Sequence, residues 1–281
     1  MSVGMVLEGG GMRGLYTAGV LDTLIDEKIS IDGMVTVSAG ALFGINFASG
    51  QKGRALRYNK TYINDKRYIS LRSLIRTGDM VNKEFAYYTV PFSLDIFDEE
   101  AFKASGIAFY ATVTNMETGE PEYITITDPF HQMEMLRASG SMPFVSKPVV
   151  NNGVRYLDGG VSDSIPYEKA KSLGYDKTIV ILTRPLAYRK TKPSRFVIDR
   201  WYRHYPKFKK TLKNRYANYN QTVEKITEDE QSGEAFVIRP SQTIQIGRLE
   251  RDPDKLQAIY DLGVQDAIMR LAELKQYINQ S

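Results

Sequence analysis

The chain has 281 residues, a formal net charge of +4 at pH 7 and no cysteine. The absence of cysteine excludes disulfides, a thiol nucleophile and thiolate metal ligands. No stretch approaches the roughly 20 apolar residues of a membrane-spanning helix, and the sequence opens without a signal-peptide pattern. We therefore expect a cytoplasmic protein, with at most peripheral contact with a membrane.

Two strand-to-helix units open the sequence. Residues 3–8 predict a short buried strand and residues 11–27 a helix, whose apolar side chains recur at helical spacing. Residues 34–37 predict a second buried strand, and the helix after it ends near Gly50. Two such units in succession indicate a parallel sheet. The fold class we predict is α/β, in a single domain spanning residues 1–281.

Strand and helix patterns alternate along the rest of the chain. Residues 51–104 combine polar helices with aromatic residues between Phe85 and Phe97. We interpret these aromatic residues mainly as core packing, with an acyl pocket as the alternative. Asn152-Gly153 is a strong hairpin signal, so Asp158 lies just beyond the end of the strand that follows. The further strands expected are 107–114, 122–127, 148–150, 154–157, 178–182 and 235–238, and the further helices 130–138, 166–172 and 253–278.

Ser38 lies at the corner between the second strand and its helix, in the run Val35-Thr36-Val37-Ser38-Ala39-Gly40. By itself such a serine would be a helix N-cap, but a sharp turn of this kind also exposes the hydroxyl of a nucleophile. Upstream, the loop Gly9-Gly10-Gly11-Met12-Arg13-Gly14 can bring backbone amides close to a substrate oxyanion, because glycine has no Cβ. Together with Asp158-Gly159-Gly160 these motifs predict an acyl-transfer site.

A serine hydroxyl needs a base to become a nucleophile, and Asp158 is the base that we favour. A carboxylate has an ordinary pKa of about 3.9, so a Ser-Asp dyad requires close contact, little water and strong oxyanion stabilisation. The only histidines are His131 and His204. A triad of Ser38, Asp158 and His204 stays open as the alternative, although His204 lies in a charged stretch rather than in a loop after a late strand.

In these motifs the chain resembles the patatin-like phospholipases. Their glycine-rich loop with a basic residue, their G-x-S-x-G elbow and their D-G-G motif correspond to residues 9–14, 36–40 and 158–160, in the family's order. The patch from Arg137 to Val149 is similar to the family's block before the aspartate strand. The resemblance spans residues 3–182. The remainder, a basic helical segment and a C-terminal helix in 183–281, carries no family signature.

The resemblance implies a three-layer α/β/α sandwich with a mostly parallel central sheet. It implies that Ser38 is the nucleophile and Asp158 its partner. The implied oxyanion hole is the loop Gly9, Gly10, Gly11, Met12, Arg13 and Gly14, and the implied elbow comprises Thr36, Val37, Ala39 and Gly40. Thr36 departs from the family, which has glycine there. Because a β-branched residue replaces one without a Cβ, we expect a wider or more strained elbow.

The glycine loop also matches the dinucleotide-binding pattern G-x-G-x-x-G. That pattern needs an acid at the end of the second strand, where Ser38-Ala39-Gly40 stand instead. We therefore expect no cofactor, and two isolated histidines without cysteine predict no metal site. Arg13 has two open roles, which are to hold the loop by hydrogen bonds or to attract an anionic headgroup.

Eleven Lys or Arg residues lie between Arg189 and Arg215, against one acid, Asp199. Aromatic residues such as Phe196 and Trp201 are interleaved with these cations. This composition is typical of a surface that contacts an anionic membrane, and equally of a solvated helical face with long cationic side chains. We expect no nucleic-acid partner.

The sequence therefore predicts a serine lipid acyl hydrolase of the phospholipase A, lysophospholipase or esterase type. Its substrate would be a lipid or fatty-acyl ester that enters outside the carboxyl ends of the strands. The alternative is a catalytically silent lipid- or membrane-binding protein of the same family.

Overall fold

A computed structural model describes residues 1–280 of the chain. Its centre is an eight-stranded sheet with the order β5-β6-β3-β2-β1-β7-β8, in which β4 pairs with β3. The strands are β1 (Val3–Leu7), β2 (Gly33–Val37), β3 (Ala108–Asn115), β4 (Pro121–Ile126), β5 (Val149–Asn151), β6 (Val154–Asp158), β7 (Lys177–Ile181) and β8 (Ala235–Ile238).

The sheet is parallel at its centre and antiparallel at one edge. The strands β3, β2, β1, β7 and β8 run parallel, as the repeated strand-to-helix units predicted. The strands β4 and β6 both run antiparallel to β3, and β5 pairs antiparallel with β6 through the predicted Asn152-Gly153 turn. The antiparallel pairing of β3 with β6 brings Asp158 beside Val113, at the same end of the sheet as the end of β2.

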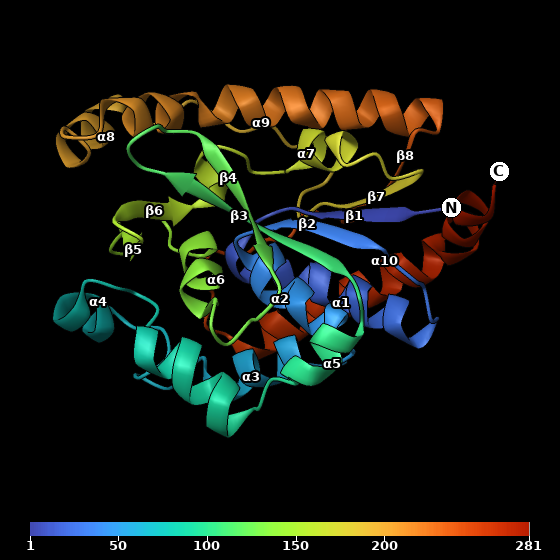
Figure 1. Cartoon of the computed structure of the whole chain (residues 1–281), viewed down its shortest axis with the longest axis horizontal. Helices are drawn as coiled ribbons and strands as arrows, with labels where there is room; N and C mark the ends of the chain where they lie inside the picture. Colours follow the sequence, from blue (N-terminus) through green and yellow to red (C-terminus); the bar gives the residue numbers. More distant parts are fainter. Residues whose placement is uncertain (281) are drawn as a thin grey trace.

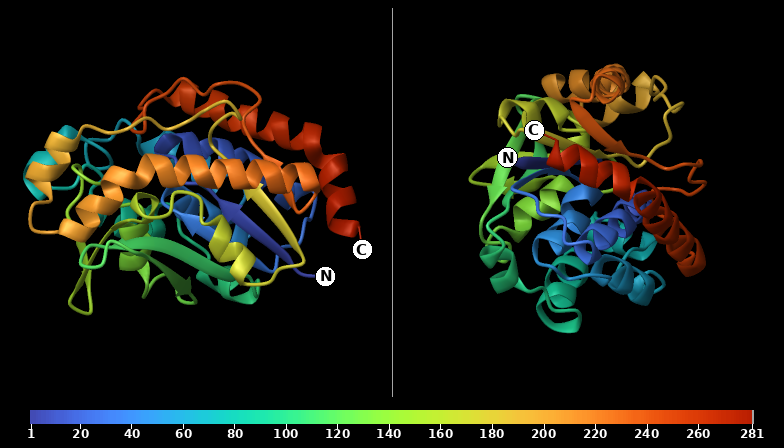
Figure 2. Two further views of the ribbon diagram at one scale, coloured as in Figure 1. Left: turned by 90° about the horizontal axis from the view of Figure 1, so that it is seen from above. Right: turned by 90° about the vertical axis from the view of Figure 1, so that its right-hand side faces the viewer.

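Helices cover both faces of the sheet, which gives three layers (Figures 1 and 2). One face carries α7 and the long α9, and the other carries α1, α2 and α10. This confirms the predicted α/β sandwich with a mostly parallel sheet. The helices are α1 (Gly14–Asp26), α2 (Ala39–Ala48), α3 (Arg54–Tyr62), α4 (Leu71–Thr77), α5 (Glu99–Ala104), α6 (Met133–Ser139), α7 (Tyr167–Ser172), α8 (Arg195–Trp201), α9 (Pro206–Ser232) and α10 (Pro253–Asn279), with the short 3-10 turns η1 (Gly11–Arg13) and η3 (Gly159–Val161) and the wide-turned helix η2 (Glu84–Leu94).

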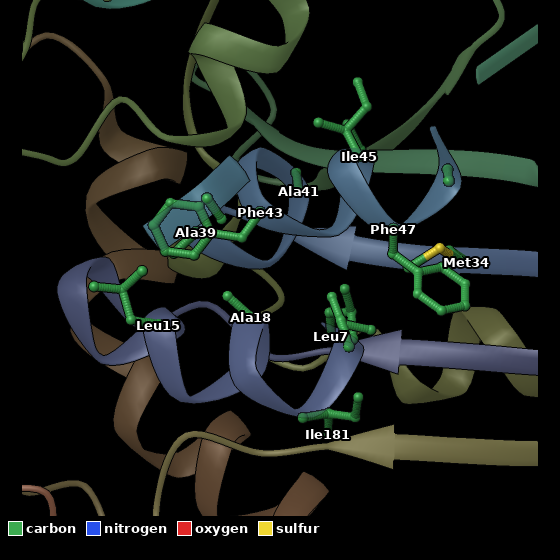
Figure 3. Close-up of a cluster of buried hydrophobic side chains, with 14 of the residues drawn as sticks. Leu7, Leu15, Ala18, Met34, Ala39, Ala41, Phe43, Ile45, Phe47 and Ile181 are labelled. Carbon is green, nitrogen blue, oxygen red and sulfur yellow. The ribbon is translucent and has the colours of Figure 1, made fainter. Parts of the chain in front are cut away.

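The core follows from the alternation of side chains along the strands. In β1, Met5 and Leu7 pack in the larger core with α1, α2 and α10, whereas Val6 packs under α7 and α9. Figure 3 shows Leu7 with Met34 and Ile181 of the neighbouring strands, beside the helices of the larger core. Because both faces are covered, the central strands are mostly apolar, with buried threonines such as Thr36 and Thr112 among the apolar residues.

Two stretches differ from the sequence expectation. The basic segment is split between a loop, α8 and the start of α9, and α9 continues to Ser232 through a region for which no element was predicted. The aromatic region from Phe85 to Phe97 falls largely in η2, whose wide turns interrupt ordinary helical spacing. Among the described residues, no helix combines the length and hydropathy needed to cross a membrane.

Candidate active site

Ser38 occupies the sharp turn between β2 and α2, with φ 57° and ψ −125°. Such a backbone conformation is strained for a residue with a side chain, and it is retained where the surroundings enforce it. The close approach of α2 to β1 falls at Gly40, where a Cβ would lie 2.8 Å from the carbonyl oxygen of Leu7. The sequence therefore needs glycine at position 40 to hold this turn.

Thr36, the departure from the family pattern, is fully buried in β2. Its hydroxyl donates a 2.7 Å hydrogen bond to the carbonyl oxygen of Tyr110 on the neighbouring β3. The strand pairing at Thr36 is regular, with Leu7 on one side and Ala111 on the other. The β-branched residue is accommodated within the sheet, so the expected widening is not seen in the pairing of β2.

The hydroxyl of Ser38 donates a 2.8 Å hydrogen bond to Oδ2 of Asp158. The other carboxylate oxygen of Asp158 accepts a 2.7 Å hydrogen bond from the amide of Gly160. Both residues are buried, and burial raises the pKa of the Asp158 carboxyl, although Arg215, Ser38 and the Gly160 amide act in the opposite direction. The geometry therefore joins a hydroxyl to a carboxylate that is a stronger base than an exposed aspartate.

The end of α6 and the segment after it fix the backbone of both residues. Ser139 accepts a 2.9 Å hydrogen bond from the amide of Ser38 and donates a 2.7 Å hydrogen bond to the carbonyl of Thr112. The carbonyl of Ser141 accepts a 2.8 Å hydrogen bond from the amide of Asp158. The sequence patch from Arg137 to Val149 thus has a physical role, which is to tie β2, β3 and β6 together at the site.

Neither histidine hydrogen-bonds to Ser38 or Asp158 in the part of the chain that the structure describes. His204 lies exposed between α8 and α9, where its Nε2 accepts from Arg203. His131 is exposed beside Asp128. The structure does not assemble the alternative triad.

The glycine loop contributes fewer free amides than its sequence suggests. The amide of Gly9 donates to the carbonyl of Ser164 and that of Met12 to the carbonyl of Arg248. Among residues 1–280 the amides of Gly10 and Gly11 have no hydrogen-bond partner, and both residues line the polar cavity beside Ser38. The candidate oxyanion donors therefore narrow from the six-residue loop to these two amides.

Arg13 is buried and donates a 3.3 Å hydrogen bond to the carbonyl of Ile246. Its Nε has no partner among the described residues. Burial and the nearby cations Arg184 and Arg248 lower the pKa of Arg13 to about 10. The hydrogen bond supports the loop-holding role. Arg13 also lines the polar cavity beside Ser38, so the role of attracting an anionic headgroup stays open.

An apolar cavity of about 140 Å³ opens beside Ser38. Its walls include Leu42 and Phe43 of α2 and Leu136 of α6. Several residues of the aromatic region also line it, so the sequence interpretation of that region as core packing was incomplete. These residues are Ala86, Tyr87, Val90, Pro91 and Phe97.

A polar cavity of about 40 Å³ lies on the other side of Ser38. It shares Gly11, Ser38, Met142 and Arg248 with the apolar cavity. The cationic side chains Arg184, Lys190, Arg215 and Arg248 line it. The sequence placed Lys190 and Arg215 in the basic segment but assigned none of the four to the active site. They come from three different stretches of the sequence, so no local motif could have placed all four beside Ser38.

Comparison with known proteins agrees with this architecture. The family described as "Patatin-like phospholipase" matches residues 5–171, and a second family, "Domain of unknown function (DUF6363)", matches residues 205–279. Because the first match covers more than half of the sequence, the chain belongs to the patatin-like phospholipase family.

Individual relatives are more distant. The chain is 29% identical over 187 residues to "Uncharacterized protein YjjU" of Escherichia coli, a match that covers 65% of this chain and 52% of that protein. It is 28% identical over 186 residues to "Lysophospholipase nte1" of Aspergillus fumigatus, covering 62% of this chain and 11% of that protein. The chain thus corresponds to about half of the first relative and about a tenth of the second.

A solved structure supports the fold over nearly the whole chain. The crystal structure of VipD from Legionella pneumophila aligns with a TM-score of 0.50 and 14% sequence identity. The alignment covers 97% of this chain and 67% of that chain. At this identity the similarity concerns the fold alone.

Proposed function

We propose that the protein is a serine lipid acyl hydrolase that uses a Ser38–Asp158 dyad. The observation that carries the proposal is the 2.8 Å hydrogen bond from the Ser38 hydroxyl to the Asp158 carboxylate, on a sharp strand-to-helix turn between an apolar and a polar cavity. Membership of a phospholipase family supports a lipid ester as substrate. The name of the Aspergillus relative adds lysophospholipids to the candidate substrates.

In the first half of the reaction, Ser38 Oγ attacks the ester carbonyl carbon while Asp158 accepts its proton. The amides of Gly10 and Gly11 stabilise the oxyanion of the tetrahedral intermediate. The intermediate then collapses, the bond between the carbonyl carbon and the alcohol oxygen breaks, and Asp158 returns the proton to the leaving alkoxide. The product is an acyl-enzyme on Ser38 and a free alcohol.

In the second half, water attacks the acyl carbon and gives a proton to Asp158. The bond from the acyl carbon to Ser38 Oγ breaks, and the proton passes back to Ser38. The carboxylic acid leaves and the resting dyad is restored. Burial of the carboxyl helps both halves, because a base with a raised pKa accepts a proton more readily.

The apolar cavity is suited to the acyl chain. An engineered protein cavity of roughly 150 Å³ accommodates benzene, so the about 140 Å³ beside Ser38 corresponds to a short acyl chain or to the first carbons of a longer one. Profiling aryl esters of increasing acyl length measures this limit. We expect kcat/KM to be highest for short chains unless the walls move apart.

We also propose peripheral contact with an anionic membrane through residues 189–215. The segment exposes Phe196, Val197 and Trp201 of α8 together with arginines such as Arg195 and Arg200. Exposed aromatic residues among cations are suited to the headgroup region of a bilayer. A catalytically silent lipid-binding protein would use the same surface. Membrane binding therefore does not distinguish the two candidate functions, and a measurement of ester hydrolysis does.

Hydrolysis of a short-chain p-nitrophenyl ester tests the proposal. We expect Ser38→Ala to abolish enzymatic hydrolysis of the ester. Asp158→Asn should lower kcat by about 10²–10⁴-fold, the range for a lost general base. His204→Ala should retain wild-type activity and serves as the control. Full activity after Asp158→Asn, or loss of activity after His204→Ala in folded protein, would refute the dyad.

A further inference from the structure

Five cationic side chains surround the polar cavity beside Ser38. They are Arg13, Arg184, Lys190, Arg215 and Arg248, and the carboxylates that line the same cavity are Glu8 and Asp158. Four of the five lie outside the residues that match the patatin-like family, which end at position 171. The C-terminal third of the chain therefore supplies most of the charge at the site.

Opposite charge balances these cations only in part, since Glu8 and Asp158 are the two carboxylates that line the cavity. In the described part of the chain, none of the five forms an ion pair with an acidic side chain. Arg184 instead lies 4.3 Å from the ring centre of Tyr188, and Lys190 lies 3.6 Å from that of Tyr219. Aromatic faces stabilise a cation without cancelling its charge.

The charged groups are held in place. Ser164 accepts hydrogen bonds from Nζ of Lys190 at 3.1 Å and from Nε of Arg215 at 3.2 Å, and donates to the carbonyl of Gly160. Gly160 also leaves the space that Arg215 uses, since a Cβ there would lie 3.2 Å from Arg215 Nη2 and 3.0 Å from Asp158 Oδ1. The guanidinium of Arg215 thus lies within reach of the dyad.

Burial, and after it repulsion from neighbouring cations, lowers the pKa of two of these groups. Burial and the neighbouring Arg215 lower the pKa of Lys190 well below its ordinary value. Burial and Arg248 lower the pKa of Arg215. A bound anion would relieve this repulsion and would supply the acceptors that the guanidinium groups lack.

The cavity has an open approach. Tyr188, Lys190, Arg215 and Arg248 also line an open groove of about 480 Å³, whose far side is formed by α8 through Val197 and Ile198. A molecule can therefore extend from the α8 surface, past the cations, to Ser38. The acyl chain would then occupy the apolar cavity on the opposite side of the nucleophile.

We propose that Arg184, Lys190, Arg215 and Arg248, with Arg13 at the rear, form a subsite for a phosphate group on the alcohol portion of the substrate. The inference rests on the proposed hydrolase function and adds to it the residues that would select acyl esters whose leaving alcohol carries a phosphate or phosphodiester over neutral esters. A guanidinium pairs with phosphate oxygens through parallel hydrogen bonds. The cavity of about 40 Å³ has room for a few water-sized groups, which suits a phosphate better than a bulky headgroup.

Selectivity between two lipids with the same acyl chain tests the subsite. The substrates are lysophosphatidylglycerol and monoacylglycerol, each below its aggregation concentration, and the readout is the ratio of their kcat/KM values. We expect the wild-type ratio to favour the phosphodiester, and Arg215→Gln and Lys190→Gln each to lower it by about ten- to a hundredfold, the effect of losing a hydrogen bond to a charged group. Changes in Ser38 or Asp158 reactivity cancel in the ratio.

Lys210→Gln is the matched control, because Lys210 lies on the same helix as Arg215, loses the same charge and is exposed. Its ratio should equal that of the wild type. A wild-type ratio near one, or an equal fall in all three variants, would overturn the subsite.

Inhibition by inorganic phosphate helps to distinguish a subsite for the phosphate of a lipid headgroup from a site for free phosphate. We expect inorganic phosphate to inhibit hydrolysis of p-nitrophenyl acetate by the wild type competitively, and to inhibit Arg215→Gln less. Inhibition without any preference for lysophosphatidylglycerol would assign the site to free phosphate and contradict the substrate class. If no ester is hydrolysed at all, the hydrolase function fails, and a phosphate-dependent rise in the Tm of the wild type but not of Arg215→Gln still decides whether the cations bind an anion.

Discussion

Asp158 is the residue at which the needs of folding and of the proposed chemistry conflict. Its carboxylate is buried, and burial raises its pKa despite hydrogen bonds from Ser38 and Gly160. A carboxyl whose pKa is higher in the folded state favours folding while it is protonated, and this contribution is lost as the pH rises through the folded-state pKa. Ionised Asp158 therefore costs stability at neutral pH, where the proposed mechanism needs it.

Two measurements follow at this residue. The kcat/KM of the wild type for a neutral aryl ester should fall as the pH drops through the raised pKa of Asp158, so the acidic limb should lie above the 3.8 typical of aspartate. The Tm of Asp158→Asn at pH 7 should be equal to or higher than that of the wild type, with the difference shrinking toward low pH. An acidic limb below pH 3.8, or a variant strongly destabilised at pH 7, would contradict the assignment of Asp158 as a buried base.

The sequence predicted Ser38 and Asp158 because both lie in short local motifs with defined backbone requirements. It could not predict Lys190, Arg215 or Arg248, since each is an ordinary surface-type residue until the fold brings it beside the dyad. It could not show that the amides of Gly9 and Met12 are already hydrogen-bonded, because their partners, Ser164 and Arg248, lie far along the chain.

At the scale of elements, the crossing of α1 and α10 joins the family core to the C-terminal segment. The two helices approach so closely that a Cβ on Gly263 would lie 2.1 Å from the carbonyl oxygen of Tyr16, and a Cβ on Gly19 would lie 2.1 Å from that of Tyr260. Backbone atoms on both sides cannot move aside easily. Together with β8, which pairs with β7, this crossing supports our proposal that residues 1–281 form one domain.

Gly263→Ala tests that proposal. We expect the added Cβ to lower the free energy of unfolding of the whole chain by about 1–3 kcal/mol, the usual cost of overpacking, within one transition seen alike by far-UV and near-UV circular dichroism. Gly247→Ala is the control, because the nearest atom to a Cβ there is 4.0 Å away. Separate transitions for the two spectral regions, with only one shifted, would indicate two independent units.

Most elements could be predicted because each has a clear hydrophobic period or a turn signal, such as Asn152-Gly153. The antiparallel placement of β6 beside β3 could not, since nothing local in 154–157 specifies its partner. The helix α9 was missed beyond Arg215 because its apolar side chains, including Tyr219 and Val223, are widely spaced in a strongly polar stretch.

At the scale of the whole molecule, several exposed apolar side chains lie at one end. The helices α4 and α8 and the β5–β6 hairpin lie at the end opposite the N-terminus (Figures 1 and 2). Ile75 is 77% exposed there, Phe196 77% and Trp201 63%. The sequence indicated only the 189–215 part of this surface, because α4 and β5 join it through the fold. The groove bounded by α8 shares Lys190, Arg215 and Arg248 with the polar cavity beside Ser38.

Flotation with liposomes tests whether this end contacts a membrane. We expect binding to vesicles containing anionic lipid, weaker at high salt because the arginines are exposed, and at least severalfold weaker for the double variant Phe196→Ser, Trp201→Ser. Ile268→Ser is the control, since Ile268 is an exposed apolar residue on α10. Equal binding of the double variant and the control would exclude α8 as the contact.

Covalent labelling by a fluorophosphonate probe, located by mass spectrometry, tests the central claim most directly. The account predicts a single adduct on Ser38 in the folded wild type, none in Ser38→Ala, and slow labelling in Asp158→Asn, because the carboxylate would no longer accept the serine proton. An adduct on another serine, or a folded wild-type protein that stays unlabelled, would contradict the claim that Ser38 and Asp158 form a working dyad.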